Sequence, residues 1–282
     1  MSISFVTAVL PVLLLLFFIY RKDALNPEPL GLLLLTFAVG CFSVLPASLL
    51  EGMLMPLAPG NPLMAAVFEG YVVAGFSEEL CKLLLLMLVI WRSRHFDEYF
   101  DGVVYAAFLS LGFACIENLM YVLGSTDPMS TSIMRGLLAV PAHFLFAVTM
   151  GYYLSLAKFD PEHRGRHLLM ALLLPVLLHG TYDSLLMVGS ALGGDMALIS
   201  GVLTVVFIFF DVKMWRWGLN RIKRMQERTK EQLCYRSGYR GTGPGRSDSC
   251  RGIHFFGCRM AGGCDQVQLG HLQPGRRALH GV

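Results

Sequence analysis

The sequence is dominated by apolar blocks of roughly 20 residues, the length at which a helix crosses a hydrocarbon core about 30 Å thick. Charged residues make up 15% of the chain, whereas a soluble domain has about 25%. This deficit excludes a soluble enzyme. The blocks are residues 3–20, 31–50, 65–91, 103–123, 133–157, 168–188 and 196–215, and they predict an all-α, polytopic transmembrane bundle of about seven spans.

Basic residues gather in every second loop of this predicted bundle, whereas loops 51–62, 124–132 and 189–195 contain no Lys or Arg. By the positive-inside rule, the N-terminus therefore faces out and the C-terminus faces the cytoplasm. The first block has no basic region before it and no small-residue cleavage site, so we interpret it as an anchor and not as a signal peptide. The loop cations are Arg21, Lys22, Arg92, Arg94, Lys158, Arg164 and Arg166, and Arg216 begins the last basic segment.

The chain divides by composition into two parts. Residues 1–225 hold the apolar blocks and form the predicted transmembrane domain. Residues 226–282 are rich in Gly, Arg and Cys and have little hydrophobic periodicity, so we expect a disordered cytoplasmic tail. The net charge of +3 comes mainly from short loops and this tail. We interpret it as a sign of topology, and we expect the lipid bilayer and no nucleic acid as a partner.

Ionisable residues near the centres of four blocks are the strongest indication of function. Each central charge costs about 2.5 to 3.5 kcal/mol on insertion scales, so structure alone would not keep several of them. Residues near the middle of different spans lie at similar depth, which predicts that these groups meet in one site. Three pairs lie four positions apart, on one helix face. The residues are Glu78, Glu79 and Lys82, then Glu117 paired with Tyr121, then His143, and then His179 with Asp183.

A charge count narrows the chemistry of this predicted site. With neutral histidines, the four carboxylates and Lys82 leave a net charge of minus three, which a low-dielectric cavity disfavours. Either some carboxyls are protonated, or the histidines are charged, or a divalent metal lies among them. A carboxylate that acts as general base and a metal that activates water both suit hydrolysis. The chain has no Gly-x-Ser-x-Gly, HExxH or Gly-rich phosphate motif.

Other residues have simpler interpretations. A lone histidine such as His143 is more often a packing residue than a ligand, and only its neighbours favour a functional role. Asp97, Glu98 and Asp101 fall in a predicted cytoplasmic loop, so we expect all three to be solvated. Gly112 and Gly151 lie inside apolar blocks, where we expect them to allow close helix packing.

Four motifs follow one another on successive blocks, preceded by a short turn after the first block. Each motif alone is weakly specific, but the ordered set is strongly specific. The turn is Asn26-Pro-Glu-Pro29, and the motifs are Glu78-Glu79-x-x-Lys82, Phe113-x-x-x-Glu117-Asn118-x-x-Tyr121, His143, and His179-x-x-x-Asp183.

This ordered set resembles the PrsW family of intramembrane proteases, which is related to the CAAX proteases and bacteriocin-processing enzymes. The resemblance covers about residues 1–215. It implies an endopeptidase of the bacterial inner membrane that hydrolyses a peptide bond in a membrane-anchored protein, and it makes residues 1–225 a protease domain. In the best-known role of the family, the substrate is an anti-sigma factor cut at the first step of a signalling cascade (site-1 cleavage). The resemblance leaves a glutamic mechanism and a metal-dependent one open.

The resemblance also implies roles for the acidic residues. Glu78 is expected to be the general base that activates water, and Glu117 is expected opposite it on the next helix. Glu79 is expected to orient the water or to hold a metal. Lys82 would offset the charge of the acidic pair.

The remaining roles concern the histidines and their neighbours. His179 and Asp183 resemble a pair that polarises the scissile carbonyl. His143 is expected to be a second electrophile or a metal ligand; zinc is the candidate ion, and His143 and His179 are its candidate ligands. Tyr121 is expected to brace Glu117 through a hydrogen bond, with Asn118 in a supporting position.

Two alternatives remain at this point. A proton-coupled transporter also places carboxylates and histidines at the midplane, but such folds commonly contain an internal repeat. The sequence has no second copy of the Glu-Glu-x-x-Lys block, which disfavours a transporter. A CAAX-type or peptide-processing membrane protease is the alternative among enzymes.

Overall fold

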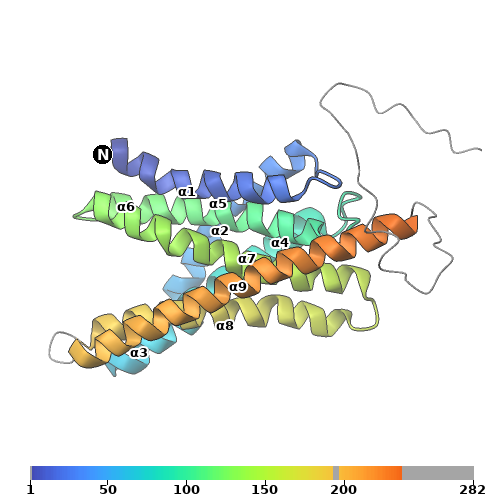
Figure 1. Ribbon diagram of the computed structural model, residues 1–282. Coiled ribbons are helices and arrows are strands. Elements are labelled where there is room, and N and C mark those ends of the chain that lie inside the picture. The colour runs from blue at the N-terminus through green and yellow to red at the C-terminus, as the bar shows by residue number, and fades with distance from the viewer. Residues whose placement is uncertain (1, 193–196, 237–282) are drawn as a thin grey trace, which may run out of the picture. The chain divides into compact units, whose positions relative to one another are not determined.

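The computed structural model describes residues 2–192 and 197–236. Every regular element in these ranges is a helix, as Figure 1 shows, which confirms the predicted all-α membrane fold. Six helical segments are long and apolar enough to cross a membrane. The elements are α1 (Ser2–Lys22), α2 (Leu30–Leu54), η1 (Met55–Leu57), α3 (Pro62–Phe68), η2 (Glu69–Phe76), α4 (Ser77–Ile90), α5 (Asp101–Gly124), α6 (Pro128–Leu137), α7 (Ala139–Phe159), α8 (Arg164–Ala191) and α9 (Ala197–Arg236).

The predicted third span is the one that differs most from a continuous apolar helix. It consists of α3, the π-helical η2 and α4 in succession, and it is not among the six segments. A π-helical turn interrupts the regular α-helical hydrogen-bond ladder and often marks a functional site. The predicted fifth span is also divided, because α6 ends at Leu137 and α7 begins at Ala139. The number of spans and the orientation of the termini stay predictions.

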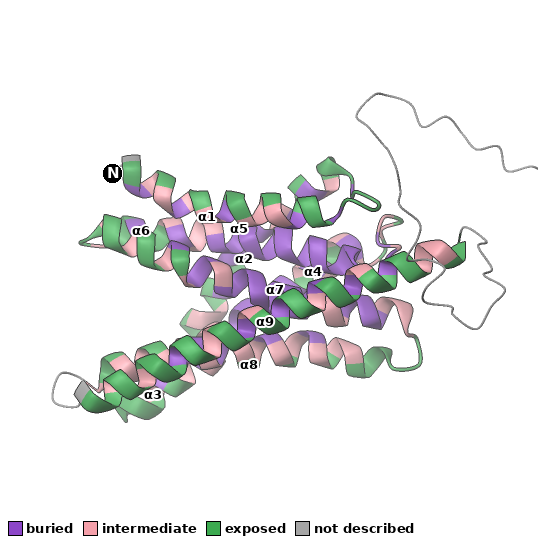
Figure 2. Ribbon diagram, in the orientation of Figure 1, coloured by how far each residue is buried: buried purple, intermediate pink, exposed green. Residues whose placement is uncertain are grey.

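The two central helices of the bundle are α5 and α7, which are largely buried, whereas α9 exposes most of its described residues and α1 buries only a few (Figure 2). Leu109 and Phe144 belong to the apolar core between them. Gly151 of α7 lies against the backbone of Gly102 in α5, and a Cβ at Gly151 would collide with that backbone. Gly112 of α5 lies equally close to α2. The expectation of close packing at Gly112 and Gly151 is therefore confirmed.

Close backbone contact also joins η2 to α8. A Cβ on Gly70 would lie 2.8 Å from the backbone nitrogen of Ser184, and one on Gly75 would lie 3.1 Å from that of Gly180. Small residues therefore allow η2 to approach α8 without an intervening layer of side chains. Because α4 continues directly from η2, this contact brings the first turn of α4 towards the middle of α8.

The predicted tail begins inside a helix, so the boundary at residue 226 is too early. α9 continues to Arg236, and residues 226–236 are helical where we expected disorder. Met225 is fully buried, Thr229 Oγ1 accepts a hydrogen bond from the Phe100 N–H at 2.9 Å, and Gln232 donates to the Asp97 carbonyl at 2.8 Å. These contacts with the loop before α5 stabilise the end of α9. The rest of the predicted tail lies outside the described residues.

The same loop corrects a second expectation. Glu98 and Asp101 are 2% and 0% exposed, so neither is solvated. Asp101 Oδ2 accepts hydrogen bonds from the N–H groups of Asp97 and Glu98, at 2.9 and 2.6 Å. Glu98 accepts one from the Asn26 side chain at 2.8 Å. These donors from the loops compensate for the lost hydration of the two carboxylates.

Candidate active site

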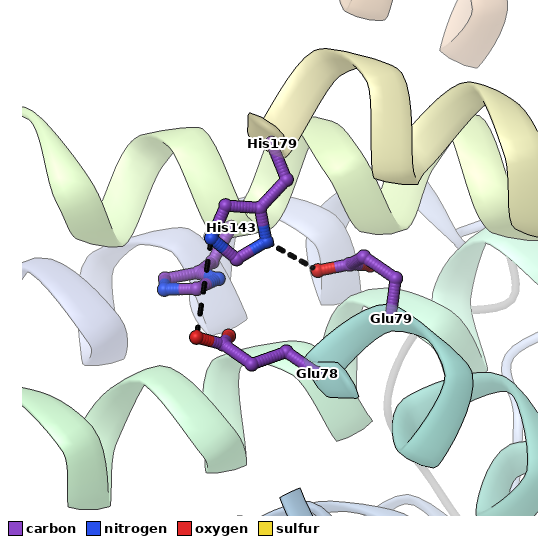
Figure 3. A group of neighbouring side chains, drawn as sticks. All are labelled: Glu78, Glu79, His143 and His179. Carbon is purple, nitrogen blue, oxygen red and sulfur yellow. Dashed lines mark hydrogen bonds and ion pairs between the residues drawn. The ribbon is translucent and has the colours of Figure 1, made fainter. Parts of the chain in front are cut away.

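Four of the predicted site residues meet in one buried cluster, drawn in Figure 3: Glu78, Glu79, His143 and His179. Each offers one potential ligand atom, and these atoms all lie within 4.8 Å of one another. Glu78 and Glu79 come from the first turn of α4, His143 from α7 and His179 from α8. The structure thus brings together residues that are up to 101 positions apart in the chain.

Lys82 lies at the centre of this cluster and is fully buried. Its Nζ donates to Glu78 Oε2 and Glu79 Oε1, each at 2.9 Å, and lies 3.2 Å from His143 Nδ1. The ammonium also lies 3.9 Å from the centre of the Phe113 ring, a cation–π contact. One cation therefore faces two carboxylates and an imidazole.

His179 is held by carboxylates at both ring nitrogens. Nδ1 lies 3.0 Å from Glu79 Oε1, and Nε2 lies 3.1 Å from Asp183 Oδ2 and 4.0 Å from Glu78 Oε1. Its ring stacks on Phe146 with the centroids 4.8 Å apart. These contacts fix the plane and direction of the imidazole.

Glu117 is bound through one oxygen, Oε2. This atom lies 2.9 Å from His143 Nε2 and 2.8 Å from Arg135 Nη2. An ionised carboxylate only accepts hydrogen bonds, so Nε2 of His143 carries the proton. Nδ1 then presents its lone pair to the Lys82 ammonium, at the centre of the cluster.

Tyr121 has a partner other than the expected one, and Asn118 contacts Arg135 and α1. Tyr121 is 53% exposed, and within the described chain no hydrogen bond joins its hydroxyl to Glu117. Its ring instead lies 3.7 Å from the Arg135 guanidinium. Asn118 is buried, donates to the carbonyl of Ala8 at 2.9 Å and accepts from Arg135 Nε at 3.2 Å.

Arg135 is the site residue that the sequence reasoning missed. It falls near the start of the apolar block 133–157, whereas the prediction used charged residues near the middles of the blocks. It is the only Lys or Arg in that block. A single arginine inside an apolar block is the signal that could have identified it, because its insertion is costly.

Two cavities adjoin the cluster. The larger, of about 630 Å³, contains Glu51 and Glu69 in its lining; the smaller, of about 270 Å³, contains Arg135 and Asp183. Glu78 and Glu117 line both. The two cavities therefore meet beside the buried cluster. The further residues shared by the two linings are Ala74, Tyr121 and Met187.

Comparison with known proteins gives a direct assignment. A sequence profile described as "PrsW family intramembrane metalloprotease" matches residues 28–212, well over half of the chain. The chain belongs to the PrsW family. It is a multi-pass membrane protein of bacteria and a peptidase, which confirms the intramembrane protease predicted from the ordered motifs.

Curated relatives in the PrsW family span most of the chain. It is 33% identical to a "Protease PrsW" of Clostridioides difficile over 231 residues, covering 80% of this chain and 93% of that protein. The "Protease PrsW" of Halalkalibacterium halodurans is 36% identical over 219 residues, covering 77% of this chain and 94% of that protein. The "Protease PrsW" of Bacillus subtilis is 34% identical over 215 residues, covering 76% of this chain and 91% of that protein. No solved structure matches the chain significantly.

The description of the PrsW family as metalloproteases invites a test of whether this cluster suits a metal ion. Two imidazoles and two carboxylates form a donor set that zinc accepts. Glu79 Oε2 is buried and has no hydrogen-bond partner in the described part of the chain. A buried, unpaired carboxylate oxygen on a member of this compact donor set fits a divalent cation, so the residues present suit such an ion.

Proposed function

We propose that Glu78 is the general base of peptide hydrolysis in this PrsW-family protease. The observation that carries this role is position: Glu78 belongs to the buried cluster and also lines both cavities. It is therefore the cluster residue that a peptide passing from one cavity to the other would meet. A carboxylate in this position can take a proton from a water molecule that attacks the scissile carbonyl.

Glu79, His143 and His179 are the residues proposed to hold a zinc ion. When bound, the ion supplies Lewis-acid polarisation and lowers the pKa of a coordinated water. The unpaired Glu79 Oε2 and the convergence of both imidazoles support this assignment. Lys82 contacts Glu78, Glu79 and His143, and it would offset the charge of the acidic pair when no other cation is near.

Glu117 and Asp183 are proposed to orient the two histidines. Carboxylates that hydrogen-bond one nitrogen of an imidazole fix its tautomer and direct the other nitrogen. The contact of 2.9 Å between Glu117 Oε2 and His143 Nε2 supports this role for Glu117. Asp183 contacts His179 Nε2 and also lines the smaller cavity, so it can polarise the scissile carbonyl when protonated.

The proposed substrate is a membrane-anchored protein whose cleavage site lies near the outer face of the membrane, and an anti-sigma factor is the specific candidate. Met55, Gly124 and Thr131 line the larger cavity, and all three fall in loops without Lys or Arg. The positive-inside rule assigns such loops to the outside. A peptide entering from that side would reach Glu78 through this cavity.

The test uses the full chain in liposomes with a single-pass membrane substrate. Glu78→Gln should abolish cleavage at unchanged expression, whereas Glu162→Gln, at an exposed position, serves as the matched control. Metal content is measured on the same samples before and after chelation. Normal cleavage by the Glu78→Gln protein would overturn its role as base. A metal-free wild type with full activity would overturn the zinc assignment alone.

A further inference from the structure

We propose that Arg135 is a positioning residue of this protease: it fixes the Glu117 carboxylate against His143 and so sets the direction of the His143 imidazole. The inference rests on the proposed function of His143. Arg135 is partly buried, with 20% of its side chain exposed, and it reaches the site from α6, a short helix outside the predicted motifs.

Three contacts restrain the guanidinium of Arg135 from different directions. Nη2 pairs with Glu117 Oε2 at 2.8 Å, and Nε donates to Asn118 Oδ1 at 3.2 Å. The face of the group lies 3.7 Å from the Tyr121 ring. A planar fork that makes two edge contacts and one stacking contact has a single orientation, which a flexible lysine ammonium would not reproduce.

Arg135 affects the orientation of His143 through one shared atom, Glu117 Oε2. Glu117 Oε2 accepts from both Arg135 and His143 Nε2, so the position of this oxygen depends on the arginine. Without Arg135, this oxygen would lose one of the two partners that fix its position beside the imidazole. The Nε2–H tautomer of His143, which leaves Nδ1 facing the cluster, would then be less favoured.

The backbone that carries Arg135 is also fixed. The hydroxyls of Ser132 in α6 and Thr7 in α1 lie 2.6 Å apart, in hydrogen-bond contact. Asn118, the second partner of Arg135, donates to the carbonyl of Ala8 in the same helix. α1 and α6 therefore support the arginine from outside the cluster, which gives the N-terminal helix an indirect part in the geometry of the site.

Arg135 also changes the charge balance. The four acids and Lys82 together carry a net charge of minus three with neutral histidines, and Arg135 reduces this to minus two. The two cations neutralise different acids, because Lys82 contacts Glu78 and Glu79 while Arg135 contacts Glu117. Lys82 thus compensates the charge of Glu78 and Glu79, and Arg135 compensates that of Glu117.

The kinetic test compares Arg135→Gln and Arg135→Lys in the full chain in liposomes, with Arg166→Gln at an exposed position as control. Loss of a residue that orients a ligand commonly costs about 10- to 100-fold, so Arg135→Gln should lower kcat by that factor with KM unchanged. Arg135→Lys keeps the charge and should recover part of the loss. An unchanged kcat, or a raised KM with unchanged kcat, would overturn the proposal, since the latter places Arg135 on the substrate.

A second measurement does not depend on cleavage. In wild-type protein labelled with ¹⁵N-histidine, the His143 resonance, assigned by its loss in His143→Asn, should report the Nε2–H tautomer. An Nδ1–H tautomer there would overturn the proposal. If the tautomer is as expected but wild type cleaves no membrane protein, the proposed function fails, whereas the orientation of His143 by Glu117, on which the role of Arg135 depends, stands.

Discussion

Two groups of buried acids lie in this protein, and they are stabilised in opposite ways. In the central cluster, every acid contacts a cation or an imidazole: Glu78 and Glu79 contact Lys82, and Glu117 contacts Arg135. In a second group, which we call the loop cluster, no Lys or Arg of the described residues forms an ion pair with any of the acids. The loop cluster consists of Asp23, Glu28, Glu98 and Asp101.

The loop cluster is held by uncharged donors. Asp23 accepts from the Glu28 N–H at 2.9 Å, Glu98 from Asn26, and Glu28 from the Tyr105 hydroxyl. Burial raises the pKa of Asp23 and of Glu98 to about 7 in each case. These acids therefore hold protons well above the pH at which an exposed carboxyl loses them.

The different partners of the acids in the central cluster and the loop cluster indicate different roles for the two clusters. Alternating acids, cations and imidazoles keep groups ionised and adjacent, as a hydrolytic site requires. Acids bound to backbone, amide and phenol donors join segments that are distant in the chain, here the loops after α1 and before α5. We infer that the central cluster supports chemistry and the loop cluster supports stability.

The largest expected effect is on the cleavage rate, and it should be seen for a substitution in the central cluster but not for one in the loop cluster. Glu79→Gln should lower kcat by about a thousandfold or more without unfolding the protein, because it removes a proposed ligand but keeps the side-chain volume. Asp101→Asn should leave the cleavage rate per folded molecule unchanged and lower the unfolding temperature. Both are measured with the liposome assay and by thermal unfolding in detergent. A catalytic defect in Asp101→Asn would break the distinction.

The next effect concerns the buried cation. Lys82→Met leaves Glu78 and Glu79 without their ion pair, and breaking a buried pair by removing one partner typically costs about 3 to 5 kcal/mol. Lys82→Arg keeps the charge but changes its reach and geometry, so it should retain some stability and activity. Thermal unfolding and cleavage are measured on both. Complete inactivation of both variants at unchanged unfolding temperature would instead favour a catalytic lysine.

A smaller effect is expected for the hydroxyl donor of the loop cluster. Tyr105→Phe removes the hydrogen bond to Glu28 and leaves a buried acceptor without its partner, which costs about 1 to 3 kcal/mol. Tyr99→Phe, at a half-buried position in the same segment, is the control. Equal unfolding temperatures for Tyr105→Phe and wild type would show that Glu28 does not depend on this donor.

The smallest expected effect is a change in pH dependence. Because the folded-state pKa of Glu98 is raised to about 7, the folded protein holds a proton that the unfolded chain has already lost. Stability from this group is therefore present at low pH and is lost as the pH rises from about 4 to about 7. In Glu98→Gln, which can still accept from Asn26, the fall in unfolding temperature over that range should be smaller than in wild type. An unchanged slope would contradict the raised pKa.

The sequence predicted the central cluster well because charges inside apolar blocks have few structural explanations. Glu78, Glu79, His143 and His179 could be selected by their depth alone, and the structure brings them together. Arg135 could not be selected in this way, because it lies near the start of its block and not near the middle. Its contacts with Glu117, Asn118 and Tyr121 depend on how α6 packs beside α5.

The loop cluster was missed for a related reason. A charged residue in a loop is usually solvated, and no local pattern distinguishes the loops that become buried. Glu98 and Asp101 are buried only because the loop after α1 and the end of α9 pack against their segment. The interruption of the third block by η2 likewise gave no clear sequence signal, since its residues remain apolar.

The sequence by itself determined that this protein is a helical membrane protein with ionisable groups in its interior, because apolar length and the cost of buried charge are local properties. Its ordered motifs also determined the family. Only the tertiary structure decided which acid meets which cation, which nitrogen of His143 carries the proton, and which loop acids are buried. Those depend on contacts between helices that lie far apart in the chain, and hydrogen bonds and ion pairs act only over a few ångströms.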